Sequence, residues 1–88
     1  MKVKSDYVLR SVAGSYFIIP VGEESVNSSR MITVNESGKA IWDALQTDRD
    51  FDGVMKIMLE TYDVSEEQMK QDLEAFLATL RNAGILEE

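Results

Sequence analysis

The chain changes from strand-forming to helix-forming residues within one short stretch, which reads Val34-Asn35-Glu36-Ser37-Gly38-Lys39-Ala40-Ile41-Trp42-Asp43-Ala44-Leu45. Asn35 is suited to cap a helix, because its side-chain oxygen can accept a backbone N–H of the first turn. Gly38 lacks a Cβ atom and would let that helix approach a neighbouring element closely. Ile41, Trp42 and Leu45 fall at helical spacing, so we expect them to anchor the core.

Upstream of this stretch the sequence predicts three strands. Residues 7–12 and 16–21 are rich in strand-forming side chains, and Ala13-Gly14 between them is suited to a tight turn. Two such runs joined by a short turn indicate a β-hairpin. A polar loop follows, and residues 30–34 form the third, shorter strand.

Downstream of the same stretch the sequence predicts two further helices. The first has apolar residues at i, i+3, i+4, i+7, i+8 and i+11, starting at Phe51, which is an amphipathic pattern. The second has the capping-box residues Ser65 and Gln68 at its start and Gly84 at its end. The predicted fold is therefore α+β and winged-helix-like: a three-stranded antiparallel sheet followed by three helices, in one domain over residues 1–88.

The composition of the 88-residue chain argues against catalysis. The chain has no cysteine and no histidine, which excludes disulfides, thiolate or imidazole metal sites and Cys–His or Ser–His nucleophiles. Its five glycines are scattered, so no phosphate-binding loop is indicated. Adjacent carboxylates do not by themselves indicate an acid–base pair. We expect a protein without enzymatic activity and without a cofactor.

The start of the chain is charged and shows no signal peptide. No apolar run approaches the roughly 20 residues of a membrane-spanning helix. We therefore expect a cytoplasmic protein that does not enter a membrane.

The net charge of −7 is concentrated in the helical half of the chain. Residues 1–40 carry five Lys or Arg and four Asp or Glu, whereas residues 41–88 carry four and twelve. The last predicted helix has four acidic and two basic side chains. Nucleic-acid binding depends on Lys and Arg at phosphates, so we expect no nucleic-acid partner.

A three-stranded sheet leaves strand edges with unpaired backbone groups. An extended peptide can add to such an edge as a further strand. The third strand, beside the last helix, is the expected place. That strand could also be a plain core strand, and each apolar residue of the helix, taken alone, is better suited to the core than to a binding groove. A second copy of the chain could also pair with the same edge, so a homodimer formed through paired strands is a further alternative.

Three parts of the sequence, taken in order, resemble the PqqD-like family, which is named for a protein of pyrroloquinoline quinone biosynthesis. The stretch 34–45 is similar to that family's Leu-Asn-x-Thr-Gly-x-x-Ile-Trp-x-x-Leu motif, with Val34 in place of Leu and Ser37 in place of Thr. Residues 7–22 resemble the family's hairpin, and residues 62–86 resemble its last helix and tail.

The resemblance implies a recognition element that captures the leader of a ribosomally made precursor peptide and presents it to a modifying enzyme, usually a radical S-adenosylmethionine enzyme. The enzyme would hold the iron–sulfur clusters. The leader would lie antiparallel to the third strand, in the groove between that strand and the third helix. By position, the site residues are Arg30, Met31, Ile32, Thr33 and Val34 for backbone pairing, and Met69, Leu73, Phe76, Leu77 and Leu80 for the wall.

Two basic residues of the last helix, Lys70 and Arg81, would meet acidic side chains of the leader or stay solvated. A different function also fits the sequence: an acidic winged-helix module that binds a regulatory protein partner.

Overall fold

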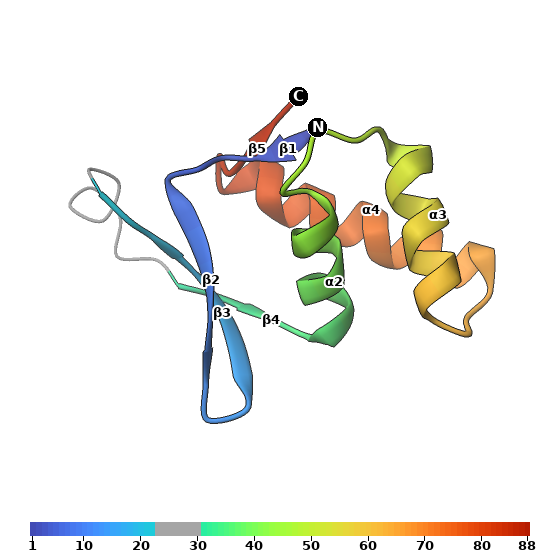
Figure 1. Ribbon diagram of the computed structural model, residues 1–88, viewed down its shortest axis with the longest axis horizontal. Coiled ribbons are helices and arrows are strands. Elements are labelled where there is room, and N and C mark those ends of the chain that lie inside the picture. Colours follow the sequence, from blue (N-terminus) through green and yellow to red (C-terminus); the bar gives the residue numbers. More distant parts are fainter. Residues whose placement is uncertain (23–30) are drawn as a thin grey trace.

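The computed structural model describes residues 1–22 and 31–88, which form a three-stranded sheet followed by three helices (Figure 1). The antiparallel sheet has the order β2-β3-β4, with strands β2 (Tyr7–Val12), β3 (Ser15–Pro20) and β4 (Ile32–Val34). The helices are α2 (Glu36–Ala44), α3 (Phe51–Thr61) and α4 (Glu66–Asn82). The predicted α+β architecture is confirmed.

The hairpin of β2 and β3 closes through a two-residue turn. Val12 pairs with Ser15, and the residues between them, Ala13 and Gly14, have φ angles of 52° and 83°. Positive φ at both central residues is what a type I′ turn requires, and this turn suits the twist of paired strands. The predicted hairpin and its turn are therefore both present.

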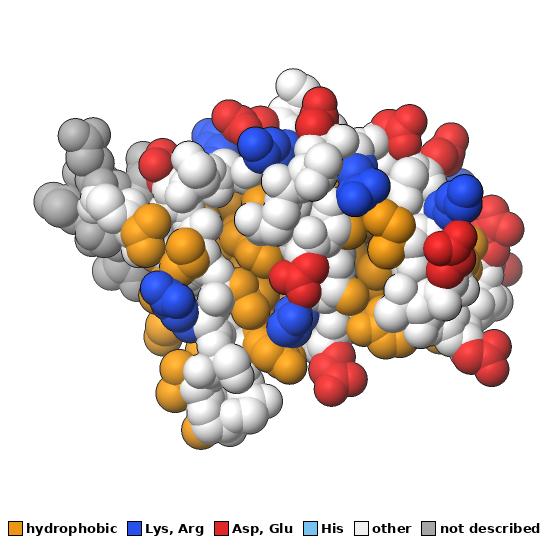
Figure 2. Space-filling model, in the orientation of Figure 1, with side chains coloured by type: hydrophobic (Ala, Val, Ile, Leu, Met, Phe, Trp, Pro, Cys, Tyr) orange, Lys and Arg blue, Asp and Glu red, His pale blue; other side chains and the backbone are white. Residues whose placement is uncertain are grey.

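Register determines which side chains of the sheet face the helices. Ile18 pairs with Ile32, and Tyr16 pairs with Val34. Because side chains alternate along a strand, these four share one face, and Ile18 and Val34 on it are buried. The opposite face carries Phe17 and is partly exposed. In Figure 2, acidic side chains gather mainly over the helices, and hydrophobic side chains are visible both along the sheet and between the helices.

A second, smaller sheet was not predicted. Strands β1 (Lys2–Val3) and β5 (Leu86–Glu87) pair antiparallel and bring the first and last residues side by side (Figure 1). Two residues per strand are too few to give a sequence pattern. The buried Val3 is held by its N–H, which donates to the carbonyl of Leu45 at 3.0 Å.

The helix ends follow the sequence closely. The side-chain oxygen of Asn35 accepts from the Gly38 N–H at 2.8 Å, and the Ser65 hydroxyl accepts from the Gln68 N–H at 3.1 Å. Gly84 has a φ of 73°, and the next N–H, of Ile85, donates to the carbonyl of Leu80 at 2.9 Å. This pattern is a Schellman cap. The predicted caps at residues 35, 65 and 84 are confirmed.

One apolar core lies between the inner face of the sheet and the helices. Trp42, the largest member, is 3% exposed, in agreement with its predicted role as an anchor. Helix α4 contributes four buried residues at helical spacing: Met69, Leu73, Leu77 and Leu80. These buried side chains fix the orientation of α4. The neighbouring face of the helix, which includes Phe76, is therefore turned toward the space beside β4.

Candidate functional site

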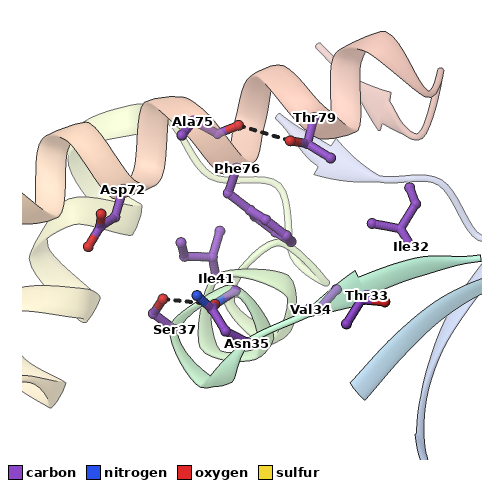
Figure 3. Close-up of a pocket in the computed structure, with 11 residues that line it drawn as sticks. Ile32, Thr33, Val34, Asn35, Ser37, Ile41, Asp72, Ala75, Phe76 and Thr79 are labelled. Atoms are coloured by element: carbon purple, nitrogen blue, oxygen red, sulfur yellow. Dashed lines mark hydrogen bonds between the residues drawn. The ribbon is translucent and has the colours of Figure 1, made fainter. Parts of the chain in front are cut away.

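A groove runs between strand β4 and helix α4, with helix α2 at its floor. Its main part is a pocket of about 460 Å³ that opens to solvent. Figure 3 shows Phe76 projecting from α4 into the middle of this pocket, toward Val34. The lining residues come from all three elements: Ile32, Thr33, Val34, Asn35, Ser37, Gly38, Ile41, Asp72, Ala75, Phe76 and Thr79.

The groove continues past the carboxyl-terminal end of α4. A second pocket of about 360 Å³ shares Ile32 and Thr79 with the first, and is also lined by Met31, Asn82 and Ala83. Met31 is 62% exposed. The shared residues make the two pockets one continuous surface along the last three turns of α4, which we call the β4–α4 groove.

Strand β4 forms one side of this groove with a free edge. Within the described residues it pairs with β3 on one side and with no strand on the other. Alternate residues of an antiparallel edge strand therefore turn their N–H and C=O toward the groove. The groove thus combines unpaired backbone groups with apolar side chains such as Val34, Ile41 and Phe76, which is the arrangement that accepts an added strand.

Gly38 sets the depth of the floor. A Cβ atom at this position would lie 2.6 Å from Cγ1 of Val34 and 3.2 Å from Cε1 of Phe76. The first of these distances is shorter than real Cβ contacts, so only glycine lets α2 pack this closely under β4 and α4. The predicted close approach of this glycine is confirmed, and the partners in that approach are two residues of the groove.

Several polar side chains line the groove, and some of them are bound within the protein. Asn35 accepts from the Ser37 hydroxyl at 3.0 Å while it caps α2. The Thr79 hydroxyl donates to the carbonyl of Ala75 at 3.2 Å (Figure 3). Asp72 is the one ionisable residue among the groove's described lining residues, and it accepts a 3.0 Å bond from Nε2 of Gln68.

A smaller pocket of about 300 Å³ lies on another side of α2 and is lined by Tyr16, Glu36, Lys39, Ala40, Asp43 and Tyr62. Its polar groups bind one another. Nζ of Lys39 donates to Asp43 at 2.8 Å and lies 5.8 Å from the centre of the Tyr16 ring. The hydrogen bond and charge of Asp43 raise the pKa of Lys39. Because these groups already have partners, this pocket is a weaker candidate for a binding site.

Comparison with known proteins identifies the family of the chain. The family model described as coenzyme PQQ synthesis protein D (PqqD) matches residues 22–86. This chain belongs to the PqqD family. The match includes β4 and all three helices, and so the whole β4–α4 groove.

One solved structure has the same fold: TbiB1 in complex with the TbiA(beta) leader peptide. It aligns with a TM-score of 0.75 and 20% sequence identity, over 99% of this chain and 95% of that chain. No curated protein matches the chain. In the described part of the chain, no helix is both long and apolar enough to span a membrane, and no cluster of three or more potential metal ligands occurs there.

The structure separates the site residues predicted from the sequence into distinct groups. Five of them line the β4–α4 groove: Met31, Ile32, Thr33, Val34 and Phe76. Four others, Met69, Leu73, Leu77 and Leu80, are at most 2% exposed and belong to the core. Arg30 lies outside the described residues. The sequence left open which residues of the last helix face the groove; of its five apolar candidates, Phe76 does so.

The two predicted basic residues do not line the groove. Lys70 is exposed on α4, and Arg81 is bound to Glu88, with Nη2 2.7 Å from the carboxylate oxygen. The groove residues of α4 that were not predicted from the sequence are Asp72, Ala75, Thr79 and Asn82. Asp72, Ala75, Phe76 and Thr79 are spaced at i, i+3, i+4 and i+7, which places them on one face of a helix. This spacing from Phe76 is the sequence signal from which Asp72, Ala75 and Thr79 could have been predicted.

Proposed function

We propose that this chain is a peptide-binding adaptor that captures the leader of a ribosomally made precursor peptide in the β4–α4 groove. The observation that carries the proposal is the free edge of β4 beside a groove whose centre is Phe76. Two findings support it. The chain belongs to the PqqD family, and a solved structure with the same fold is a complex with a leader peptide.

In this proposal the leader adds to β4 as an antiparallel strand. The backbone groups of residues 31–34 bind the leader backbone, and alternate leader side chains enter the groove. This mode explains how a short peptide can be held by a domain of this size, since most of the affinity comes from groups that every residue has. Sequence preference then depends on the few side chains that line the groove.

The adaptor contributes no chemistry of its own and acts by tethering. Holding the leader raises the effective concentration of the rest of the precursor at a modifying enzyme. We propose a radical S-adenosylmethionine enzyme as this partner, with the iron–sulfur clusters in the enzyme. The chain would act in the cytoplasm as one peptide-recognition domain over residues 1–88.

The lining of the groove favours a peptide over a nucleic acid. No Lys or Arg is present among the described residues that line it. Phosphate groups are bound mainly by these two residue types, and Asp72 would repel them. A second copy of the chain remains a competing occupant of the β4 edge, as does a regulatory protein partner, and the experiment below separates these outcomes.

The test is an amide NMR titration of the labelled protein with leader peptides encoded beside its gene. We expect shifts concentrated in residues 31–38 and 72–83. Ala75→Arg should fill the groove and weaken binding at least about tenfold. Ala78→Arg is the matched control, because Ala78 is an exposed alanine of the same helix that does not line the groove.

Equal binding by the two arginine variants would contradict the groove as the site. Shifts that depend on protein concentration and occur without peptide would indicate a dimer through the β4 edge. No shifts with any of the encoded leaders, at any protein concentration, would contradict leader binding and favour the regulatory protein partner.

A further inference from the structure

The β4–α4 groove has an uneven charge distribution. Among its described lining residues, Asp72 alone is ionisable. The ion pairs of the described residues involve other carboxylates, namely those of Asp43, Asp48 and Glu88. Asp72 instead accepts a hydrogen bond from the neutral side-chain amide of Gln68. A half-buried carboxylate therefore faces the groove without a cation beside it.

The cations of α4 cannot supply that partner in the described structure. Lys70 is two positions away along the helix, and residues at i and i+2 point to different sides. Arg81 is more than two turns away and is bound to Glu88. None of the ion pairs of the described residues involves Asp72, so a molecule that occupies the groove can supply its cation.

Asp72 also lies at a defined end of the groove. Figure 3 shows it on the side of Ser37 and Asn35, with Phe76 in the middle and Ile32 and Thr79 at the other end. Along the helix, Asp72 and Phe76 are separated by about 6 Å. This is close to the spacing of about 6.6 Å between alternate residues of an extended strand. Two alternate side chains of an added strand can therefore face Asp72 and Phe76.

The direction of the added strand decides their order. β4 runs from Ile32 toward Asn35, so an antiparallel partner runs from the Asp72 end toward the Ile32 end. The leader residue that faces Asp72 then comes two positions before the residue that packs on Phe76. A charge-assisted hydrogen bond to a Lys or Arg at the first position would be stronger than a neutral one, whereas a Glu or Asp there would be repelled.

We propose that the groove selects leaders with a basic side chain two residues before an apolar one, and that Asp72 is the residue that determines this preference. The inference rests on the proposed leader binding and names the sequence class that is bound. Electrostatic complementarity of this kind contributes mainly to specificity. The proposed preference for a basic leader side chain is opposite to the expectation from the sequence, in which Lys70 and Arg81 would meet acidic side chains of the leader.

The experiment is a selection from a random twelve-residue peptide library displayed on phage. Peptides that bind the unmodified protein and not an Ala75→Trp variant, which fills the groove without adding charge, are counted as groove-dependent. We expect these peptides to share a Lys or Arg followed, after one variable residue, by an apolar residue. Asp72→Asn should weaken the binding of a representative peptide about tenfold, and Asp72→Lys should select Asp or Glu at the same position.

Glu74→Lys is the matched control, because it makes the same change in net charge on an exposed residue of α4 that does not line the groove. It should leave the preference unchanged. Groove-dependent peptides without a charge preference, or an equal reversal in Glu74→Lys, would overturn this inference and leave leader binding standing. No groove-dependent peptides at all would overturn the proposed function itself.

Discussion

Two sides of helix α4 differ in what they do, although both contain large apolar residues. The core side, with Met69, Leu73, Leu77 and Leu80, is closed by the sheet and the other helices. The groove side has Phe76 together with small and polar residues. The core side packs against the rest of the protein and holds the helix in place. The groove side is not used in that packing and is therefore available for contacts with a partner. Whether an apolar residue of α4 contributes to stability or to binding therefore depends on how deeply it is buried, and not on its residue type.

The largest effect is expected on the core side. Leu73→Ala removes a side chain that is 0% exposed and should lower the free energy of unfolding by about 2–5 kcal/mol. Chemical denaturation followed by circular dichroism measures this loss. At temperatures where the variant is still folded, peptide affinity should change little. A stable variant that had lost peptide binding would break the division between the two sides of the helix.

On the groove side, truncation of an aromatic residue should reduce peptide affinity more than it reduces stability. Phe76→Ala should weaken peptide binding at least about tenfold, with a smaller loss of stability, about 1–2 kcal/mol, because the ring is only partly buried. Phe17→Ala is the matched control: Phe17 is also partly buried, on the outer face of the sheet. Titration of both variants with one peptide provides the measurement. Equal losses of affinity would show that the outer face takes part in binding.

Local sequence signals were sufficient to predict most of the fold. Helix caps depend on single residues such as Asn35 and Ser65, and the hairpin depends on a two-residue turn. Each of these acts over four residues or fewer, so the chain specifies them without distant contacts. The pairing of β1 with β5 joins the two ends of the chain, and its two-residue strands carry no periodic pattern. It could not be read from local sequence.

The candidate site was predicted less completely, for a physical reason. Strand β4 could be placed because it precedes a strong helix start. On α4, however, an apolar residue fits the core and the groove equally well, and the angle of the helix is fixed by contacts with α2, α3 and β5 that are distant in sequence or set by the whole fold. The apolar pattern of the helix therefore pointed to Leu73 and Leu77, which are buried in the core, and gave no sign of Asp72 and Thr79. The rotation of α4 about its own axis was the missing information.

The smallest effect is expected for Arg81, which belongs neither to the core side nor to the groove side of α4. Arg81 donates to Glu88 at 3.0 Å from Nε and 2.7 Å from Nη2, and this hydrogen bonding holds the pKa of the Glu88 carboxyl below its usual range. A lowered pKa in the folded state favours folding at neutral pH, and this contribution disappears as the pH falls through the folded pKa. Both side chains are exposed, so the contribution is small and weakens with salt.

Arg81→Gln should therefore raise the pKa of Glu88 toward its ordinary value, which an NMR titration of the side-chain carboxyl measures directly. Stability should fall slightly at neutral pH and should equal that of the unmodified protein in acid. Peptide affinity should not change, because Arg81 does not line the groove. A large loss of affinity, confined to peptides with acidic residues, would instead place Arg81 in the binding site and extend the groove side of α4 by a further turn.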